Sequence, residues 1–156
     1  MRVEKESAGN PMLKGAYVSV LVVMAITGFV QMPIFKRYYI ADIPGLGWLA
    51  DFYFTHTLHY LGAMALMGLF AYFITDYVLR NKNTYRLTAA AYVRIFFMAG
   101  LVGTGILRVL KNLPDITFSP ALTLFIDLAH LGFMMSFVLA ALAFLILKKG
   151  WIRGPY

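Results

Sequence analysis

Four long runs of apolar residues alternate with short polar segments along the chain. The runs cover about residues 16–35, 52–79, 87–107 and 121–147, and Arg94 interrupts the third. Each run reaches the ~20 residues that an α-helix needs to cross the hydrocarbon core of a bilayer. The pattern therefore predicts four transmembrane helices.

Composition supports this prediction. Of the 156 residues, 61% are apolar and only 13% are charged, whereas a soluble domain of this length needs more polar surface to cover its core. We therefore predict an all-α fold, an integral membrane four-helix bundle that forms one domain over residues 1–156. The chain has no cysteine, so any cofactor must be held by histidine, methionine, carboxylates or packing.

The distribution of charge indicates the orientation. The formal net charge is +7, and ten of the 14 lysines and arginines lie toward the two termini and the segment between the second and third runs. The other side carries the remaining four, Lys36, Arg37, Arg108 and Lys111. The positive-inside rule then places both termini in the cytoplasm. Because these cations follow the helix ends, no basic and aromatic surface is left to bind nucleic acid.

Two of the three histidines occupy matching positions in the apolar runs. At ~1.5 Å per residue, His59 lies roughly 10 Å and His130 roughly 13 Å below the outer start of its run. An imidazole inside a membrane is costly unless it faces other helices and binds something. Two imidazoles at one level, on helices that run in the same direction, suit the axial ligation of one b-type haem.

Small residues near these histidines could leave flat space for a porphyrin. Gly62 and Gly132 closely follow the two histidines, and Gly28 and Gly103 lie in the first and third runs. The alternative is that these glycines only allow close helix packing, as small residues do in many membrane proteins.

Four polar residues lie near the outer ends of these runs. Arg108 and Lys111 are candidates for binding haem propionates, or they are snorkelling cations at a helix end. His56 and Asp127 each lie three residues before a candidate ligand and could deliver protons to a quinone. The alternatives are that His56 binds a propionate or water and that Asp127 forms a salt bridge with Arg108 or Lys111.

Short motifs carry a resemblance to a known family. The segments AITGF at 25–29, LHYLG at 58–62 and AHLGF at 129–133, with a second Thr-Gly pair in the third run, resemble cytochrome b subunits. The similar subunits anchor membrane-bound formate dehydrogenases and nickel–iron hydrogenases to the quinone pool. The resemblance implies that His59 and His130 hold a haem near the periplasmic face.

The second haem site of that family has no counterpart here. Its ligand positions fall near Leu13 or Lys14 and at Phe144, and none of these residues carries an imidazole. We therefore expect one haem b per chain, without the pair of haems that carries electrons across the membrane.

The resemblance implies a membrane anchor subunit of a respiratory oxidoreductase complex in a prokaryotic inner membrane. It would pass electrons between an extracytoplasmic iron–sulfur or cytochrome partner and membrane menaquinone or ubiquinone. The partner would dock on the loops 36–51 and 108–120. A separate catalytic subunit would convert the substrate, since the chain shows no substrate site of its own.

Two other functions stay open. In the first, His56, His59, Asp127 and His130 bind a nonhaem metal, although the glutamates typical of di-iron bundles occur only in the N-terminal tail. In the second, the chain is a haem-free structural membrane anchor.

Overall fold

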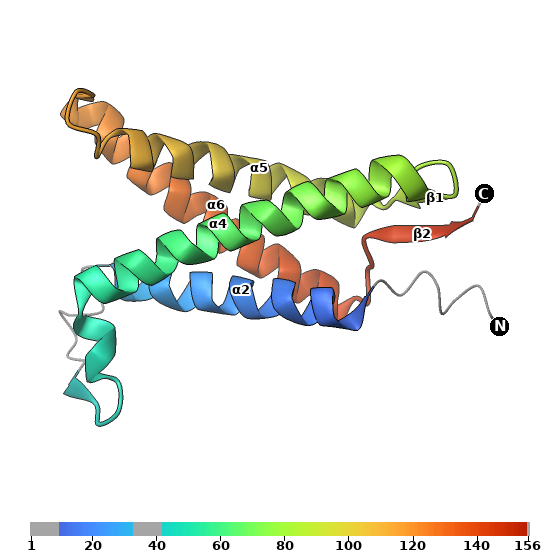
Figure 1. Ribbon diagram of the computed structural model, residues 1–156, viewed down its shortest axis with the longest axis horizontal. Helices are drawn as coiled ribbons and strands as arrows, with labels where there is room; N and C mark the ends of the chain where they lie inside the picture. Colours follow the sequence, from blue (N-terminus) through green and yellow to red (C-terminus); the bar gives the residue numbers. More distant parts are fainter. Residues whose placement is uncertain (1–9, 33–41, 156) are drawn as a thin grey trace. The chain divides into compact units, whose positions relative to one another are not determined.

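The structure is a computed structural model that describes residues 10–32 and 42–155. Its four long helices are α2 (Pro11–Val30), α4 (Phe52–Asp76), α5 (Ala89–Leu110) and α6 (Pro120–Ile146) (Figure 1). By length and composition each can cross a bilayer, which confirms the predicted all-α class with four membrane-length helices. The chain is therefore a multi-pass membrane protein.

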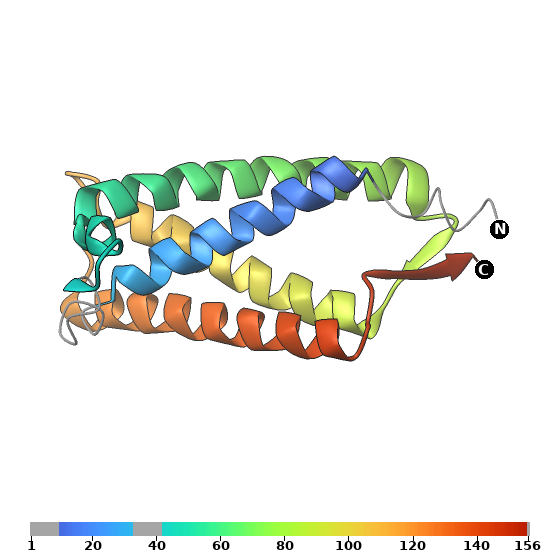
Figure 2. The same cartoon turned by 90° about the horizontal axis from the view of Figure 1, so that it is seen from below.

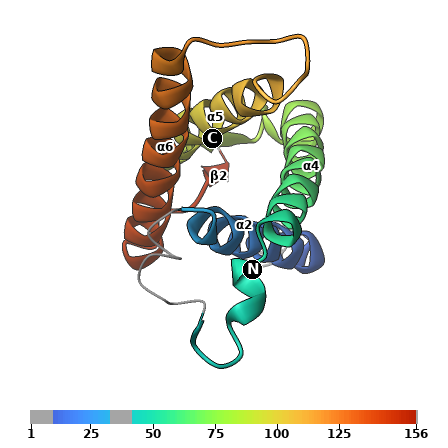
Figure 3. The ribbon, with the colours of Figure 1, turned by 90° about the vertical axis from the view of Figure 1, so that its left-hand side faces the viewer.

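Short elements extend and connect these helices. The 3₁₀ turn η2 (Gly47–Ala50) precedes α4, and the π-helical turn η3 (Tyr77–Asn81) continues α4 at its end. The strands β1 (Tyr85–Leu87) and β2 (Ile152–Pro155) pair antiparallel. Figure 3 shows η2 as a teal turn leading into α4 and, separately, the orange loop that joins α5 to α6.

A polar side chain caps the start of each long helix. The N-cap residues are Asn10, Asp51, Thr88 and Ser119, and each side chain accepts a hydrogen bond from a backbone N–H of the first turn. These N–H groups have no intrahelical partner, and the apolar part of a membrane offers no water to satisfy them. The cap at Asn10 explains why α2 begins at Pro11. The hydropathy pattern places the start at residue 16, because Lys14 and Gly15 interrupt the apolar run.

Several predictions lie outside the described residues. They concern the end of the first predicted span at 33–35, the part of the outer loop at 36–41, and the cations Arg2, Lys5, Lys36 and Arg37. The membrane orientation inferred from the charge distribution therefore stays a prediction.

The chain divides into two compact units, Met1–Arg80 and Asn81–Tyr156. In the first unit α2 packs antiparallel against α4, and in the second unit α5 packs antiparallel against α6 (Figures 1 and 2). Each unit is thus a helical hairpin whose two helices are neighbours in sequence. The single domain over residues 1–156 stays a prediction.

In each hairpin a glycine on one helix receives a large side chain from the other. A methyl group added to Gly62 of α4 would lie 2.7 Å from the sulfur of Met24 on α2. A methyl group added to Gly100 of α5 would lie 2.5 Å from the ring of Phe133 on α6. Helix pairs in lipid depend on such close packing, because burial of apolar surface gives them little driving force.

Arg94, the charged residue that interrupts the third apolar run, is only 8% exposed. Its Nη2 donates to the carbonyl oxygen of Lys149 at 2.9 Å. Its guanidinium carbon lies 4.9 Å from the ring centroid of Phe144 and 5.1 Å from that of Trp151. These contacts stabilise a charge that is costly at membrane depth, and with the β1–β2 pair they connect the C-terminal segment to α5 (Figure 2).

Replacing Gly100 with alanine should destabilise the second hairpin, because the new methyl group would lie 2.5 to 2.6 Å from three atoms of the Phe133 ring. We expect the free energy of unfolding to fall by about 1–3 kcal/mol, the usual range for overpacking. Reversible unfolding of the purified protein in detergent measures this loss. Gly68→Ala is the control, since its added methyl group would meet no atom of the described chain within 4 Å. Equal stability of the two variants would contradict the packing.

Candidate functional site

His59 of α4 contacts Thr27 of α2 within the first hairpin. The ring Nδ1 of His59 lies 2.9 Å from the Oγ1 of Thr27. The same hydroxyl lies 2.7 Å from the carbonyl oxygen of Val23, one turn earlier on α2. Thr27 is 1% exposed, so the contact is shielded from the surroundings of the hairpin.

The protons of this contact follow from donor and acceptor chemistry. A hydroxyl has one proton and a carbonyl oxygen can only accept, so the short bond to Val23 requires Thr27 to donate it. The oxygen of Thr27 then accepts from the imidazole, which makes Nδ1 of His59 the protonated nitrogen. A neutral imidazole with Nδ1–H carries its lone pair on Nε2, the nitrogen that would bind a metal ion.

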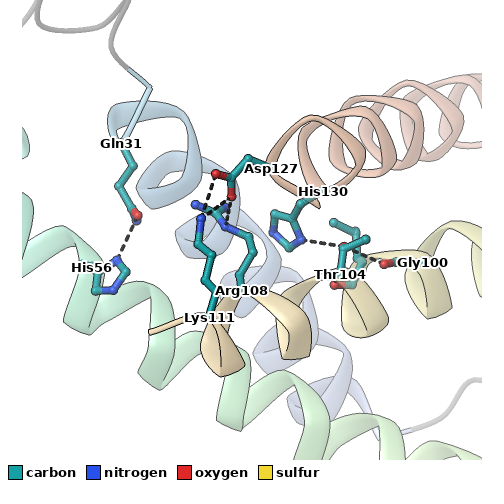
Figure 4. Close-up of polar contacts among 9 residues, drawn as sticks. Gln31, His56, Gly100, Thr104, Arg108, Lys111, Asp127 and His130 are labelled. Atoms are coloured by element: carbon teal, nitrogen blue, oxygen red, sulfur yellow. Dashed lines mark hydrogen bonds and ion pairs between the residues drawn. The ribbon is translucent and has the colours of Figure 1, made fainter. Parts of the chain in front are cut away.

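The second hairpin repeats this arrangement with His130 of α6 and Thr104 of α5 (Figure 4). Nδ1 of His130 lies 2.9 Å from Oγ1 of Thr104, and this hydroxyl donates to the carbonyl oxygen of Gly100 at 2.7 Å. The same reasoning places the proton on Nδ1 and the lone pair on Nε2. The two candidate ligands therefore have the same tautomer, set by the same kind of contact.

A glycine follows each threonine and lies near the imidazole. A methyl group added to Gly28 would lie 3.4 Å from Cε1 of His59. A methyl group added to Gly105 would lie 3.6 Å from Cε1 of His130. Each glycine thus faces the ring that its neighbouring threonine bonds, with room for a methyl group between them.

Thr27 and Thr104 are not among the site residues predicted from the sequence. The signal that identifies them is the Thr-Gly pair in the first helix of each hairpin, at 27–28 and 104–105. The bonded histidine follows the threonine by 32 residues in the first hairpin and by 26 residues in the second. This difference in spacing conceals the repeat, because internal repeats are recognised by a fixed period.

His56, the candidate proton carrier, contacts Gln31 one turn away from the His–Thr pair (Figure 4). Its Nδ1 lies 3.1 Å from Oε1 of Gln31, while Nε2 of Gln31 donates to the carbonyl oxygen of Thr27 at 2.9 Å. The imidazole also stacks on Phe52 with ring centroids 5.1 Å apart and packs against Tyr60 at 4.4 Å. The side chain of His56 is thus held within the first hairpin.

Asp127 is bound by two cations at the end of α5 (Figure 4). Nζ of Lys111 lies 2.9 and 2.8 Å from the two carboxylate oxygens, and Nε of Arg108 lies 3.1 Å from one of them. The salt bridge considered as the alternative role of Asp127 is therefore present. Because two cations share one carboxylate, the cluster keeps a formal excess of one positive charge.

These two polar contacts occupy equivalent positions in their hairpins. Gln31 and Arg108 lie four residues after the bonded threonine, and His56 and Asp127 lie three residues before the candidate ligand. Each hairpin therefore has a His–Thr contact and, one turn nearer its connecting loop, a second polar contact. The second contact joins an amide to an imidazole in one hairpin and is an ion pair in the other.

The other glycines predicted to lie near a porphyrin differ in their surroundings. The side chain of Met24 takes up the space beside Gly62. A methyl group added to Gly103 or Gly132 would meet no atom of the described chain within 4 Å. These two glycines leave open helix surface on the second hairpin, which a flat group or a lipid chain could cover.

Clusters of metal ligands are missing from the part of the chain that the structure describes. Among residues 10–32 and 42–155, no group of three or more His, Cys, Asp or Glu side chains could hold a metal ion. Nonhaem metal sites take at least three such ligands from the protein. The alternative of a nonhaem site therefore lacks support in the described residues.

Comparison with known proteins gives no match: no protein-family model, curated protein or solved structure matches the chain. The resemblance to cytochrome b anchors thus rests on the short motifs in the sequence. The function has to be argued from the geometry of the two hairpins.

Asp127→Asn should weaken the second hairpin, because it removes the charge that Lys111 and Arg108 share. A double-mutant cycle with Lys111→Met should give a coupling of about 0.5–1 kcal/mol in the free energy of unfolding, the upper part of the range for partly exposed pairs. The coupling should fall at high salt. The matched control is Asp76 with Arg80, whose 3.5 Å contact is more exposed and should give no measurable coupling. Equal coupling in both cycles would refute the cluster.

Proposed function

We propose that this chain is a membrane subunit that binds one b-type haem through His59 and His130 and transfers electrons. The observation that carries the proposal is the repeated His–Thr contact. Each hairpin contributes one imidazole whose lone pair is on Nε2, within a helix pair of membrane length. The resemblance of the surrounding motifs to cytochrome b anchors adds support.

The number of protein ligands supports haem over a bare metal ion. The iron of a haem receives four nitrogen ligands from the porphyrin, so two imidazoles complete its coordination. A bare ion would need further protein ligands near each histidine, and no such cluster occurs among the described residues. The donor set of this chain therefore fits a cofactor that supplies most of its own ligands.

The charged cluster of the second hairpin fits the propionates of a haem. Asp127 precedes His130 by three residues, so its partners Arg108 and Lys111 lie about one turn from the candidate ligand. Their formal excess of one positive charge would favour a propionate carboxylate at this level. Gly103 and Gly132 leave open surface on the same hairpin.

The expectation of a single haem is supported at the other end of α6. Phe144 stands where the family has a ligand for its second haem, and its ring packs under the guanidinium of Arg94. Leu13 and Lys14, at the start of α2, offer no imidazole either. We therefore propose one haem per chain.

The haem would supply one-electron redox chemistry when bound. The protein would bind it, exclude water with the apolar helix surfaces, and set the ligand tautomers through Thr27 and Thr104. His56 and Asp127 are the residues one turn nearer the connecting loops that would hold protons for a quinone, menaquinone or ubiquinone. Asp127 would first have to release one of its two cations.

The cellular setting is also a proposal. With both termini in the cytoplasm of a prokaryote, the His–Thr contacts would lie in the outer half of the membrane, since His59 is only ~10 Å from the start of α4. An iron–sulfur or cytochrome partner would then dock on the outer loops, and a separate catalytic subunit would convert the substrate. The chain itself would be an electron carrier of a respiratory oxidoreductase.

Replacing His59 or His130 with alanine should abolish the low-spin haem spectrum, because each substitution removes one axial ligand. His56→Ala should keep the spectrum, since His56 contacts Gln31 and is not one of the two proposed iron ligands. Optical spectra of the purified oxidised and reduced variants measure the effect. A His59→Ala or His130→Ala variant that keeps the wild-type spectrum would rule out the assignment.

The purified chain should contain one haem. The pyridine haemochrome assay divided by the protein concentration measures this ratio. A ratio of two would mean that ligands other than the histidines of this chain complete a second site. A colourless chain from cells that make haem would favour the haem-free structural anchor.

A further inference from the structure

Both hairpins contain a line of three hydrogen-bonding groups behind the candidate ligand. The line runs from the imidazole Nδ1 to the threonine hydroxyl and on to a backbone carbonyl oxygen one turn earlier. The two bonds measure 2.9 and 2.7 Å through Thr27, and 2.9 and 2.7 Å through Thr104. The same line of bonds, with the same lengths, thus occurs in two helix pairs of different sequence.

The line has a fixed direction. The carbonyl oxygens of Val23 and Gly100 can only accept, so each hydroxyl donates away from the histidine and accepts from it. Hydrogen bonds in such a line polarise one another, so a hydroxyl that donates to a carbonyl is a better acceptor for the imidazole N–H. The low dielectric of a membrane increases this effect.

The glycine after each threonine lies near the same ring. A methyl group added to Gly28 or Gly105 would lie 3.4 or 3.6 Å from Cε1 of the bonded imidazole, which is ordinary van der Waals contact. The hydrogen bond at Nδ1 is therefore the contact that sets the tautomer of the side chain.

We infer that Thr27 and Thr104 are positioning residues that hold His59 and His130 as Nδ1–H tautomers, with Nε2 as the ligating nitrogen. This inference rests on the proposed haem function and extends it to the residues that control the ligands. When Nδ1–H donates a hydrogen bond to a hydroxyl oxygen, the imidazole becomes more basic and its Nε2 is a stronger donor to iron. The two threonines therefore increase the affinity for haem and favour the ferric state.

The tautomer can be measured without haem. The chain has only three histidines, so ¹⁵N-histidine NMR of the full-length protein, purified haem-free in detergent, should resolve each ring. His59 and His130 should show a protonated Nδ1 and an unprotonated Nε2, with the assignment made from the His59→Ala and His130→Ala spectra. Protonation of Nε2 in either ring would overturn the inference.

Valine in place of either threonine removes the hydroxyl and keeps the branched shape. Thr27→Val and Thr104→Val should each lower the affinity for added haem by about 10- to 100-fold, the usual effect of losing a partner of a ligand. Each should also raise the midpoint potential, because the ferric state loses support. Thr27→Ser and Thr104→Ser should restore both quantities, since serine keeps the hydroxyl.

The control is Thr55→Val. Thr55 is also 1% exposed, and its hydroxyl donates to the carbonyl oxygen of Asp51 at 2.9 Å instead of contacting a histidine. If the wild type binds haem and the Thr27 and Thr104 variants match Thr55→Val in affinity and potential, the positioning role is wrong while the haem function stands. If the wild type binds no haem, the proposed function itself fails.

Discussion

A histidine inside a membrane must find its hydrogen-bond partners within the protein, because the hydrocarbon offers no water. In both hairpins the partner is a threonine on the preceding helix, and that threonine donates its own proton to the backbone. This arrangement joins the two helices of each hairpin and also determines which imidazole nitrogen keeps its lone pair. The chemistry proposed for the chain depends on this one constraint.

The two hairpins share this contact but differ one turn away. The first hairpin places the imidazole of His56 beside the amide of Gln31, whereas the second places Asp127 between Arg108 and Lys111. In the proposed electron carrier, His56 and Asp127 would hold protons for a quinone, and the cations beside Asp127 would bind a haem propionate. Equivalent positions with different side chains would allow one chain to provide both functions.

Much of the fold could be predicted from the sequence, since apolar runs of ~20 residues have few alternatives to membrane-spanning helices. The start of α2 could not, because Lys14 and Gly15 interrupt the apolar run and the first turn depends on the cap at Asn10. The pairing of β1 with β2 was also beyond reach, since strands of three and four residues leave no periodic pattern.

The candidate site was only partly predictable. His59 and His130 stand out because histidine is rare in apolar runs, and the salt bridge of Asp127 followed from charge and spacing. Thr27 and Thr104 are common residues of membrane helices, and their role depends on which helix they face. That information lies in the packing of each hairpin and not in the local sequence.

We propose that two histidines of this chain, His59 and His130, ligate one haem iron. Pulsed electron paramagnetic resonance of the oxidised protein, prepared with unlabelled and with ¹⁵N-labelled histidine, tests it most directly. The account predicts a low-spin ferric signal whose hyperfine couplings come from two similar histidine nitrogens and change together on labelling. Coupling to a single histidine, a high-spin signal, or no ferric haem signal from the intact protein would contradict it.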